Sequence, residues 1–228
     1  MKFTLDFFLF QIFPYIAFSM FLLGSILRFD RDPYSWRTKS SQLLRRKQLV
    51  VGSTLFHIGI LVVLIGHAVG LLTPIAIFEA LGITHGAKQI LAMTAGGIAG
   101  SICLVGLMML LHRRLTDPRI KANSSWADIA ILFLLLGQLV LGLLSILVSL
   151  QHLDGHEMVK FMQWAQHIVT FRGGADELIG DVAFVFKAHI TLGLFIVAIF
   201  PFTRLVHALS APLGYVVRPY QVVRKRAV

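Results

Sequence analysis

Five long apolar runs constrain this chain more than any other feature of its sequence. A helix needs about 20 residues to cross the roughly 30 Å hydrocarbon core of a membrane. Predominantly apolar runs of that length cover residues 7–27, 49–72, 90–111, 127–150 and 182–208, the last being apolar to about Phe202. The runs lack the residue-by-residue alternation of barrel strands. We therefore predict an all-α membrane protein in which five transmembrane helices form one domain over residues 1–228.

The composition excludes several other classes of protein. Apolar residues make up 57% of the chain and charged residues 14%, which is too apolar for an ordinary soluble domain or a disordered chain. The one cysteine, Cys103, lies inside an apolar run, so a disulfide scaffold is excluded as well.

Basic residues indicate the orientation of the helices, because Lys and Arg near helix ends are retained on the cytoplasmic side. Sixteen of the 21 lie on one side of the predicted membrane: seven between residues 28 and 47, four between 113 and 121, and five from 204 onward. We therefore predict an outer N-terminus, a cytoplasmic C-terminus and a cytoplasmic tail at 209–228. The net charge of +10 is then a topology signal, so we expect contact with membrane lipid and no nucleic-acid binding.

The long outer loop at residues 151–181 contains a further helical pattern. Between Glu157 and Phe171 apolar residues recur at helical spacing, at Met158, Phe161, Met162, Ala165 and Val169. The pattern predicts a short amphipathic helix along the outer interface of the membrane.

Histidine is the main ionisable residue at membrane depth, where such side chains are costly and point to function. His57 and His67 lie on the second run, and His189 and His207 on the fifth. Because these helices run in opposite directions, His67 and His189 fall in the outer leaflet, and His57 and His207 in the inner. Two facing imidazoles can bind a six-coordinate haem iron from both sides. The pattern predicts two haems, although any one of these histidines alone is more typical of a hydrogen-bonded core residue.

The axial spacing of the two histidine sets differs. At about 1.5 Å per helical residue, His57 and His67 lie about 15 Å apart, whereas His189 and His207 lie about 27 Å apart. Pro201 lies between His189 and His207, and we expect a kink there to redirect His207.

Haem propionates require cationic partners. Four basic residues fall at the membrane depth of a predicted haem. Near the inner haem these are Arg113, Arg114 and Arg204, and near the outer haem Lys187. We expect Arg114 and Arg204 to serve as propionate partners, with orientation and lipid-headgroup contact as the alternative role.

Several longer segments are more specific than these patterns. They are spread along nearly the whole chain, at Pro14-Tyr15-Ile16, Leu55 to Leu61, Gly66-His67, Leu72-Thr73-Pro74, Lys88-Gln89, Arg113-Arg114-Leu115, Gln151 to Gly155, Trp164-Ala165-Gln166 and Phe200-Pro201-Phe202. In these segments the chain resembles the gamma subunit of respiratory nitrate reductase, a di-haem cytochrome b that anchors catalytic subunits to the membrane.

The resemblance implies a quinol-oxidising role. His67 and His189 would hold the outer, distal haem b, and His57 and His207 the inner, proximal haem b. Lys88 would belong to the site of a quinol, menaquinol or ubiquinol. Electrons would pass through the distal and then the proximal haem to an iron-sulfur subunit of nitrate reductase, and protons would be released outside.

The partners implied are this iron-sulfur beta subunit and a molybdenum-containing alpha subunit, both on the cytoplasmic face of a bacterial or archaeal plasma membrane. The chain would not itself reduce nitrate, because it has no cysteine set for a cluster and no pterin-binding domain. Three other functions stay open from the residues alone. These are a cytochrome b serving another respiratory reductase, a haem-free proton channel or transporter that uses the histidines as a relay, and a purely structural anchor.

Overall fold

The computed structural model describes residues 4–36, 41, 43–151 and 153–210. This part of the chain is helical and contains no strand. Within it, five helices are long and apolar enough to cross a membrane: Leu5–Arg31, Arg46–Leu72, His85–Thr116, Trp126–Ser149 and Phe184–Phe202. The all-α class and the five spans are therefore confirmed for the described residues, whereas the predicted tail beyond residue 210 lies outside them.

The spans are built from the following elements. The first combines α1 (Leu5–Phe7), the π-helix η1 (Phe8–Ile12) and α2 (Phe13–Arg31). The next three are the single helices α3 (Arg46–Leu72), α5 (His85–Thr116) and α7 (Trp126–Ser149), and the fifth joins α10 (Phe184–Ile199) to the 3-10 helix η3 (Phe200–Phe202). Shorter elements connect or follow them: η2 (Pro33–Ser35), α4 (Ile75–Ala80), α6 (Pro118–Ala122), α8 (His156–Val169), α9 (Ala175–Leu178) and η4 (Arg204–Ser210).

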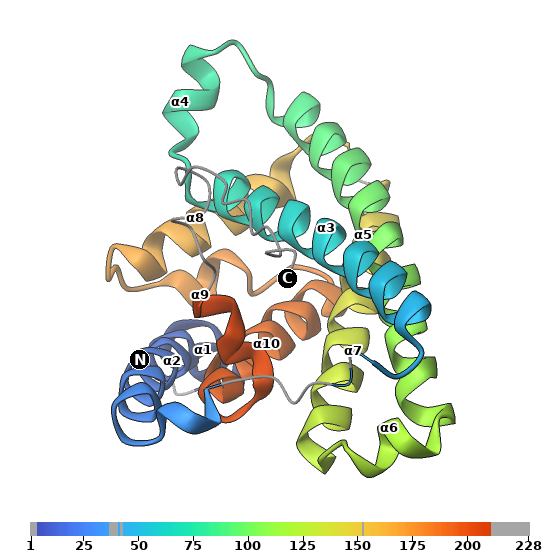
Figure 1. Cartoon of the computed structure of the whole chain (residues 1–228). Helices are drawn as coiled ribbons and strands as arrows, with labels where there is room; N and C mark the ends of the chain where they lie inside the picture. Colours follow the sequence, from blue (N-terminus) through green and yellow to red (C-terminus); the bar gives the residue numbers. More distant parts are fainter. Residues whose placement is uncertain (1–3, 37–40, 42, 152, 211–228) are drawn as a thin grey trace, which may run out of the picture.

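Helices α3 and α5 make the most extensive contact in the bundle and run side by side, with α4 in the connection between them (Figure 1). Glycines allow this close approach. A Cβ at Gly106 would lie 2.3 Å from the backbone nitrogen of Phe56, and one at Gly59 would lie 2.6 Å from the carbonyl oxygen of Ala99. The two helices therefore pack backbone to backbone, as small residues permit in membranes. Helix α7 packs between α5 and α10, and α2 packs on α10.

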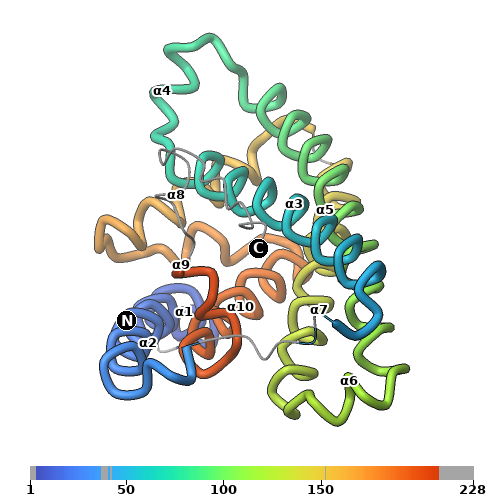
Figure 2. The backbone as a smooth tube through the Cα atoms, viewed as in Figure 1, coloured from blue at the N-terminus to red at the C-terminus, as the bar shows by residue number. Residues whose placement is uncertain are grey.

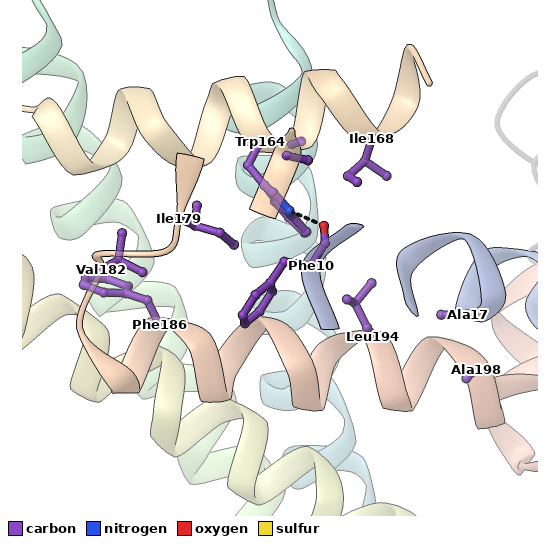
Figure 3. Packing of buried hydrophobic residues seen from close by; sticks show 11 residues of the cluster. Phe10, Ala17, Trp164, Ile168, Ile179, Val182, Phe186, Leu194 and Ala198 are labelled. Carbon is purple, nitrogen blue, oxygen red and sulfur yellow. Dashed lines mark hydrogen bonds between the residues drawn. The ribbon is translucent and has the colours of Figure 1, made fainter. Parts of the chain in front are cut away.

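Helix α8 confirms the helix predicted in the outer loop. Its Trp164 is buried among side chains of the first and fifth spans, including Phe10 and Leu194 (Figure 3). Trp164 Nε1 donates a hydrogen bond of 2.9 Å to the carbonyl oxygen of Phe10 in η1. The rings of Phe161 and Phe186 lie 4.8 Å apart between α8 and α10. Helix α8 thus packs against both the first and the fifth span and links them.

The predicted fifth helix at residues 182–208 is too long. Helix α10 ends at Ile199, and after η3 the residue Thr203 is extended, with φ −113° and ψ 177°. Pro201 has no N–H and its ring clashes with the preceding turn, so it cannot continue an α-helix. The chain then turns away from α10 as η4 (Figure 2). His207 therefore lies on a separate 3-10 segment.

Gly106→Ala is expected to lower the free energy of unfolding by about 1–3 kcal/mol, because the methyl group would press on the backbone of α3. Gly96→Ala on the same helix is the control, since its nearest neighbour, Ile146 Cδ1, would lie 3.9 Å from the added Cβ. Thermal unfolding of the detergent-solubilised protein measures both changes. An unchanged melting temperature for Gly106→Ala would contradict the backbone contact between α3 and α5.

Candidate haem and quinol sites

The four membrane histidines lie in two pairs. The ring centroids of His57 on α3 and His207 on η4 are 6.3 Å apart, and those of His67 on α3 and His189 on α10 are 6.2 Å apart. A metal–imidazole bond is about 2 Å long, so two imidazoles on opposite sides of one metal ion have centroids about 6 Å apart. Both pairs have the separation that one iron requires.

One ring nitrogen of each histidine is bonded to the backbone. The distances from Nδ1 to the carbonyl oxygen are 2.7 Å for His57 to Ser53, 2.8 Å for His67 to Val63, 3.1 Å for His189 to Gln138 and 2.6 Å for His207 to Arg204. A carbonyl oxygen only accepts, so Nδ1 carries the proton and Nε2 keeps its lone pair. Metal-binding histidines are held in this way by the bond that their second nitrogen makes.

Each pair offers two protein ligands. In the described part of the chain, no group of three or more His, Cys, Asp or Glu side chains could hold a metal ion. A bare ion such as zinc requires more protein ligands than a pair supplies. A haem fits, because its macrocycle occupies the remaining positions of a six-coordinate iron. The donor set present therefore fits the cofactor that the resemblance implies.

Residues of helix α7 contact the ring of His189. A Cβ at Gly142 would lie 3.0 Å from His189 Cε1, so this glycine makes room for the ring. Gln138 Nε2 lies 3.4 Å from His189 Nε2, while Gln138 Oε1 is buried without a hydrogen-bond partner. Sequence analysis missed both residues. The available signal was an amide side chain inside an apolar run, with a glycine one turn later.

The two expected propionate partners lie together at the other end of α7. Asp128 Oδ2 is 3.7 Å from Arg114 Nη1, and Asp128 Oδ1 is 3.8 Å from Arg204 Nη1. These three side chains together carry a net positive charge, which one anionic propionate would balance. Asp128 was missed, although Ser125 three positions earlier forms a capping box with it, a pattern that sequence can reveal.

Arg113 and Lys187 are bound elsewhere in the protein. Arg113 is buried and donates three hydrogen bonds to the loop at Ser41 and Leu44. Lys187 Nζ donates to Asp6 Oδ2 at 2.7 Å. These contacts involve Arg113 and Lys187 one at a time, whereas Arg114 and Arg204 share the single carboxylate of Asp128, so the latter two are the candidates for a propionate.

Lys88 lies near the start of α5, and only 6% of its surface is exposed. Its Nζ donates to the carbonyl oxygen of Gly70 at 2.8 Å and to Met162 Sδ at 2.7 Å. It also lies 3.8 Å from the centre of the Phe78 ring. No carboxylate in the described residues forms an ion pair with this ammonium group. Lys88 is thus a buried cation held by neutral groups.

The surface of α3 between Lys88 and His67 is open. Gly66 and Gly70 fall on one flank of His67 at helical spacing. A Cβ added to either glycine would meet no other atom within 4 Å. The α3 backbone is therefore uncovered at Gly66, which precedes His67, and at Gly70, whose carbonyl oxygen Lys88 binds.

Comparison with known proteins shows the family to which this chain belongs. A family model described as nitrate reductase gamma subunit matches residues 6–226. The chain is 50% identical over 222 residues to the respiratory nitrate reductase 1 gamma chain of Escherichia coli (strain K12), which covers 97% of this chain and 98% of that protein. It is 40% identical over 219 residues to the nitrate reductase gamma chain of Bacillus subtilis (strain 168), covering 96% and 98%.

A more distant relative is the Hdr-like menaquinol oxidoreductase cytochrome b-like subunit of Archaeoglobus profundus, which is 25% identical over 199 residues, covering 87% of this chain and 57% of that protein. The fold and these relatives define a multi-pass membrane subunit of a respiratory oxidoreductase. More narrowly, the chain belongs to the nitrate reductase gamma subunit family, the cytochrome b subunits of respiratory nitrate reductase. The family identified from the sequence is therefore confirmed.

Asp128→Asn is expected to lower the free energy of unfolding by about 1–3 kcal/mol, because two partly buried guanidinium groups would lose their shared carboxylate. Asp30→Asn makes the same charge change at an exposed position near the end of α2 and should leave stability unchanged. Thermal unfolding of both variants in one detergent gives the comparison. Equal melting temperatures would show that the Asp128 cluster does not stabilise the packing of α5, α7 and η4.

Proposed function

We propose that this chain oxidises quinol near the outer membrane surface and passes electrons inward, through a distal and then a proximal haem b, to an iron-sulfur subunit on the cytoplasmic face. His67 and His189 hold the distal haem, and His57 and His207 the proximal one. The observation that carries the proposal is the pair of ring separations, 6.2 and 6.3 Å, between elements distant in the sequence.

The protein's part in electron transfer is to hold the two ligand rings still. A six-coordinate haem, when bound, supplies one-electron transfer. The bonds from Nδ1 to backbone carbonyls fix the orientation of each ring and make Nε2 a better ligand. Arg114 and Arg204 bind a propionate of the proximal haem, which balances the net charge that they share with Asp128.

Lys88 binds the quinol. An ammonium group has three N–H donors, and the carbonyl oxygen of Gly70 and the sulfur of Met162 accept from two of them. The third can donate to a quinol oxygen, while the charge stabilises the anion that forms as the quinol proton leaves. The open flank at Gly66 and Gly70 gives the ring its place beside His67. Oxidation yields a quinone, two protons released outward and two electrons that travel inward.

The orientation and the partners belong to the same proposal. The excess of basic residues supports an outer N-terminus and a cytoplasmic C-terminus, and we propose a bacterial or archaeal plasma membrane. The iron-sulfur beta subunit and the molybdenum-containing alpha subunit dock on the cytoplasmic ends of the helices, and the chain itself does not reduce nitrate. Exposed basic residues there support such docking, at Arg46, Lys47, Arg119 and Lys121.

Haem quantification per chain tests the assignment of the ligands. The purified protein is expected to contain two haems b, and His67→Ala or His57→Ala should reduce the count to one, because each removes one axial ligand. His156→Ala, on the exposed start of α8, is the control and should keep two. A protein without a dithionite-reducible b-type band would support the haem-free channel, and an unchanged count in His67→Ala would exclude the pairing.

Lys88→Met is expected to lower kcat/KM for quinol oxidation by about a hundredfold, because it removes a donor placed where charge develops, while both haems are retained. Lys160→Met is the control, since Lys160 is an outer-face lysine that is bonded to Asp181 at 2.5 Å. The measurement is the rate of haem reduction by a quinol analogue in membranes. An unaltered rate in Lys88→Met would remove Lys88 from the site.

A further inference from the structure

The segment that carries His207 lies beyond the end of a broken helix. After α10 ends at Ile199, the carbonyl oxygens of Pro201 and Thr203 lie at the junction of η3 and η4, where no regular α-helix continues. Backbone carbonyls without partners cost several kcal/mol in a membrane, so an interruption of this kind requires donors from elsewhere in the protein. Without such donors, the junction between η3 and η4 would be less firmly held.

Arg28 supplies those donors. Its Nη1 donates to the carbonyl oxygens of Pro201 and, at 2.9 Å, Thr203. On its other side Nη2 donates to the carbonyl oxygen of Ser35 at 2.7 Å, and Nε donates to Ser35 Oγ at 3.1 Å. The guanidinium group therefore uses all three of its nitrogens, and its rigid planar shape joins η2 to the start of η4.

The neighbouring turn of α2 also packs against the junction of η3 and η4. A Cβ added at Gly24, one turn before Arg28, would lie 2.9 Å from both Cβ and Cγ of Pro201. Gly24 thus allows the proline ring to rest on the α2 backbone. At the far end of η4, Trp36 Nε1 donates to Ser210 Oγ at 2.5 Å. The segment from Pro201 to Ser210 is held at both ends by the first span and the turn that follows it.

His207 lies between these two attachments. Its Nδ1 is 2.6 Å from the carbonyl oxygen of Arg204 on the same segment. Its ring plane is inclined by 70° to that of His57, whereas the planes of His67 and His189 are inclined by 40°. The angle between the inner rings depends on where η4 lies, and hence on Arg28.

We propose that Arg28 is a positioning residue for the proximal haem: it caps the broken end of the fifth span and so holds His207 opposite His57. This inference rests on the proposed function, because it requires His57 and His207 to be haem ligands. Arg28 does not touch the His207 ring in the structure and acts through the backbone of η3 and η4.

A charge effect is the rival explanation, since any cation near a haem influences its potential. The two roles differ in what a lysine can restore. Arg28→Lys keeps the charge but can bond to only one side of the junction at a time, so it restores an electrostatic role fully and a positioning role in part. Arg31→Leu removes the same charge at an exposed position one turn later on α2.

The test uses the complete membrane-bound complex with Arg28→Leu, Arg28→Lys, Gly24→Val and Arg31→Leu. The readouts are haem per chain, the low-spin ferric EPR signal of each haem, which depends on the angle between its imidazole planes, and the two midpoint potentials. Arg28→Leu and Gly24→Val are expected to shift or abolish the proximal signal and leave the distal one unchanged. Arg28→Lys should be intermediate, and Arg31→Leu should match the unaltered protein.

Three outcomes would overturn the proposal: both signals unchanged in Arg28→Leu, equal loss of both haems, or complete restoration of the proximal signal and potential in Arg28→Lys. Measuring His207→Ala in parallel separates this inference from the proposed function. If His207→Ala keeps two haems with unaltered signals, the ligand assignment fails. If it loses the proximal signal while Arg28→Leu retains it, only the role of Arg28 fails.

Discussion

The hydrogen bond from each histidine Nδ1 to a backbone carbonyl oxygen is the interaction on which both paired sites depend. It directs the basic nitrogen of every ring away from its own backbone. For His57 and His67 the acceptor lies one turn earlier on α3, so α3 orients these two rings without help. Their partners depend more on other parts of the protein. His189 uses the carbonyl oxygen of Gln138 on another helix, and His207 uses Arg204 on a segment that other elements must fix.

The sequence alone predicted the features that depend on hydropathy and on the alternating direction of successive helices. Apolar runs predicted the five spans, and the opposite directions of two helices led to the pairing of His67 with His189 and of His57 with His207. Helix ends were predicted less well, because polar capping residues are invisible to hydropathy. Helix α5 begins at His85 rather than residue 90, since the Thr84 side chain accepts a hydrogen bond from Ala87 N and caps the helix. Pro201 predicted a kink, but how far it redirects the chain depends on Thr203 and on contacts with α2.

Which basic residues turn into the protein could not be predicted, for a related physical reason. A count of basic residues treats them all as orientation signals, whereas the structure divides them. Arg28, Arg113 and Arg114 bond to groups inside the protein, and Arg119 and Lys121 are exposed. Which arginine turns inward depends on which carbonyls are left without partners in the folded chain. Arg28 and Pro201, for example, are 173 residues apart, and nothing local to either residue indicates the contact.

The surroundings of the two histidine pairs, near the two ends of α3, accordingly differ. Around His67 the α3 flank is open at Gly66 and Gly70, and the nearby cation, Lys88, is held only by a carbonyl oxygen, a thioether and an aromatic ring. Around His207 the chain is bound at several points: Arg28 binds the carbonyl oxygen of Thr203, Trp36 binds the hydroxyl group of Ser210, and Asp128 pairs with the side chain of Arg204. A substrate that arrives and leaves requires the first arrangement.

An inner site that only relays electrons has the opposite requirement. In the proposed function each inward electron would work against about 2.3 kcal/mol per 100 mV of membrane potential, so the potential of the proximal haem would have to be well defined for transfer to proceed. A fixed ligand geometry achieves this, because ligand orientation and local hydrogen bonding are among the means by which a protein sets such a potential. By this proposal, the break in the fifth span is compatible with electron transfer because the first span caps it.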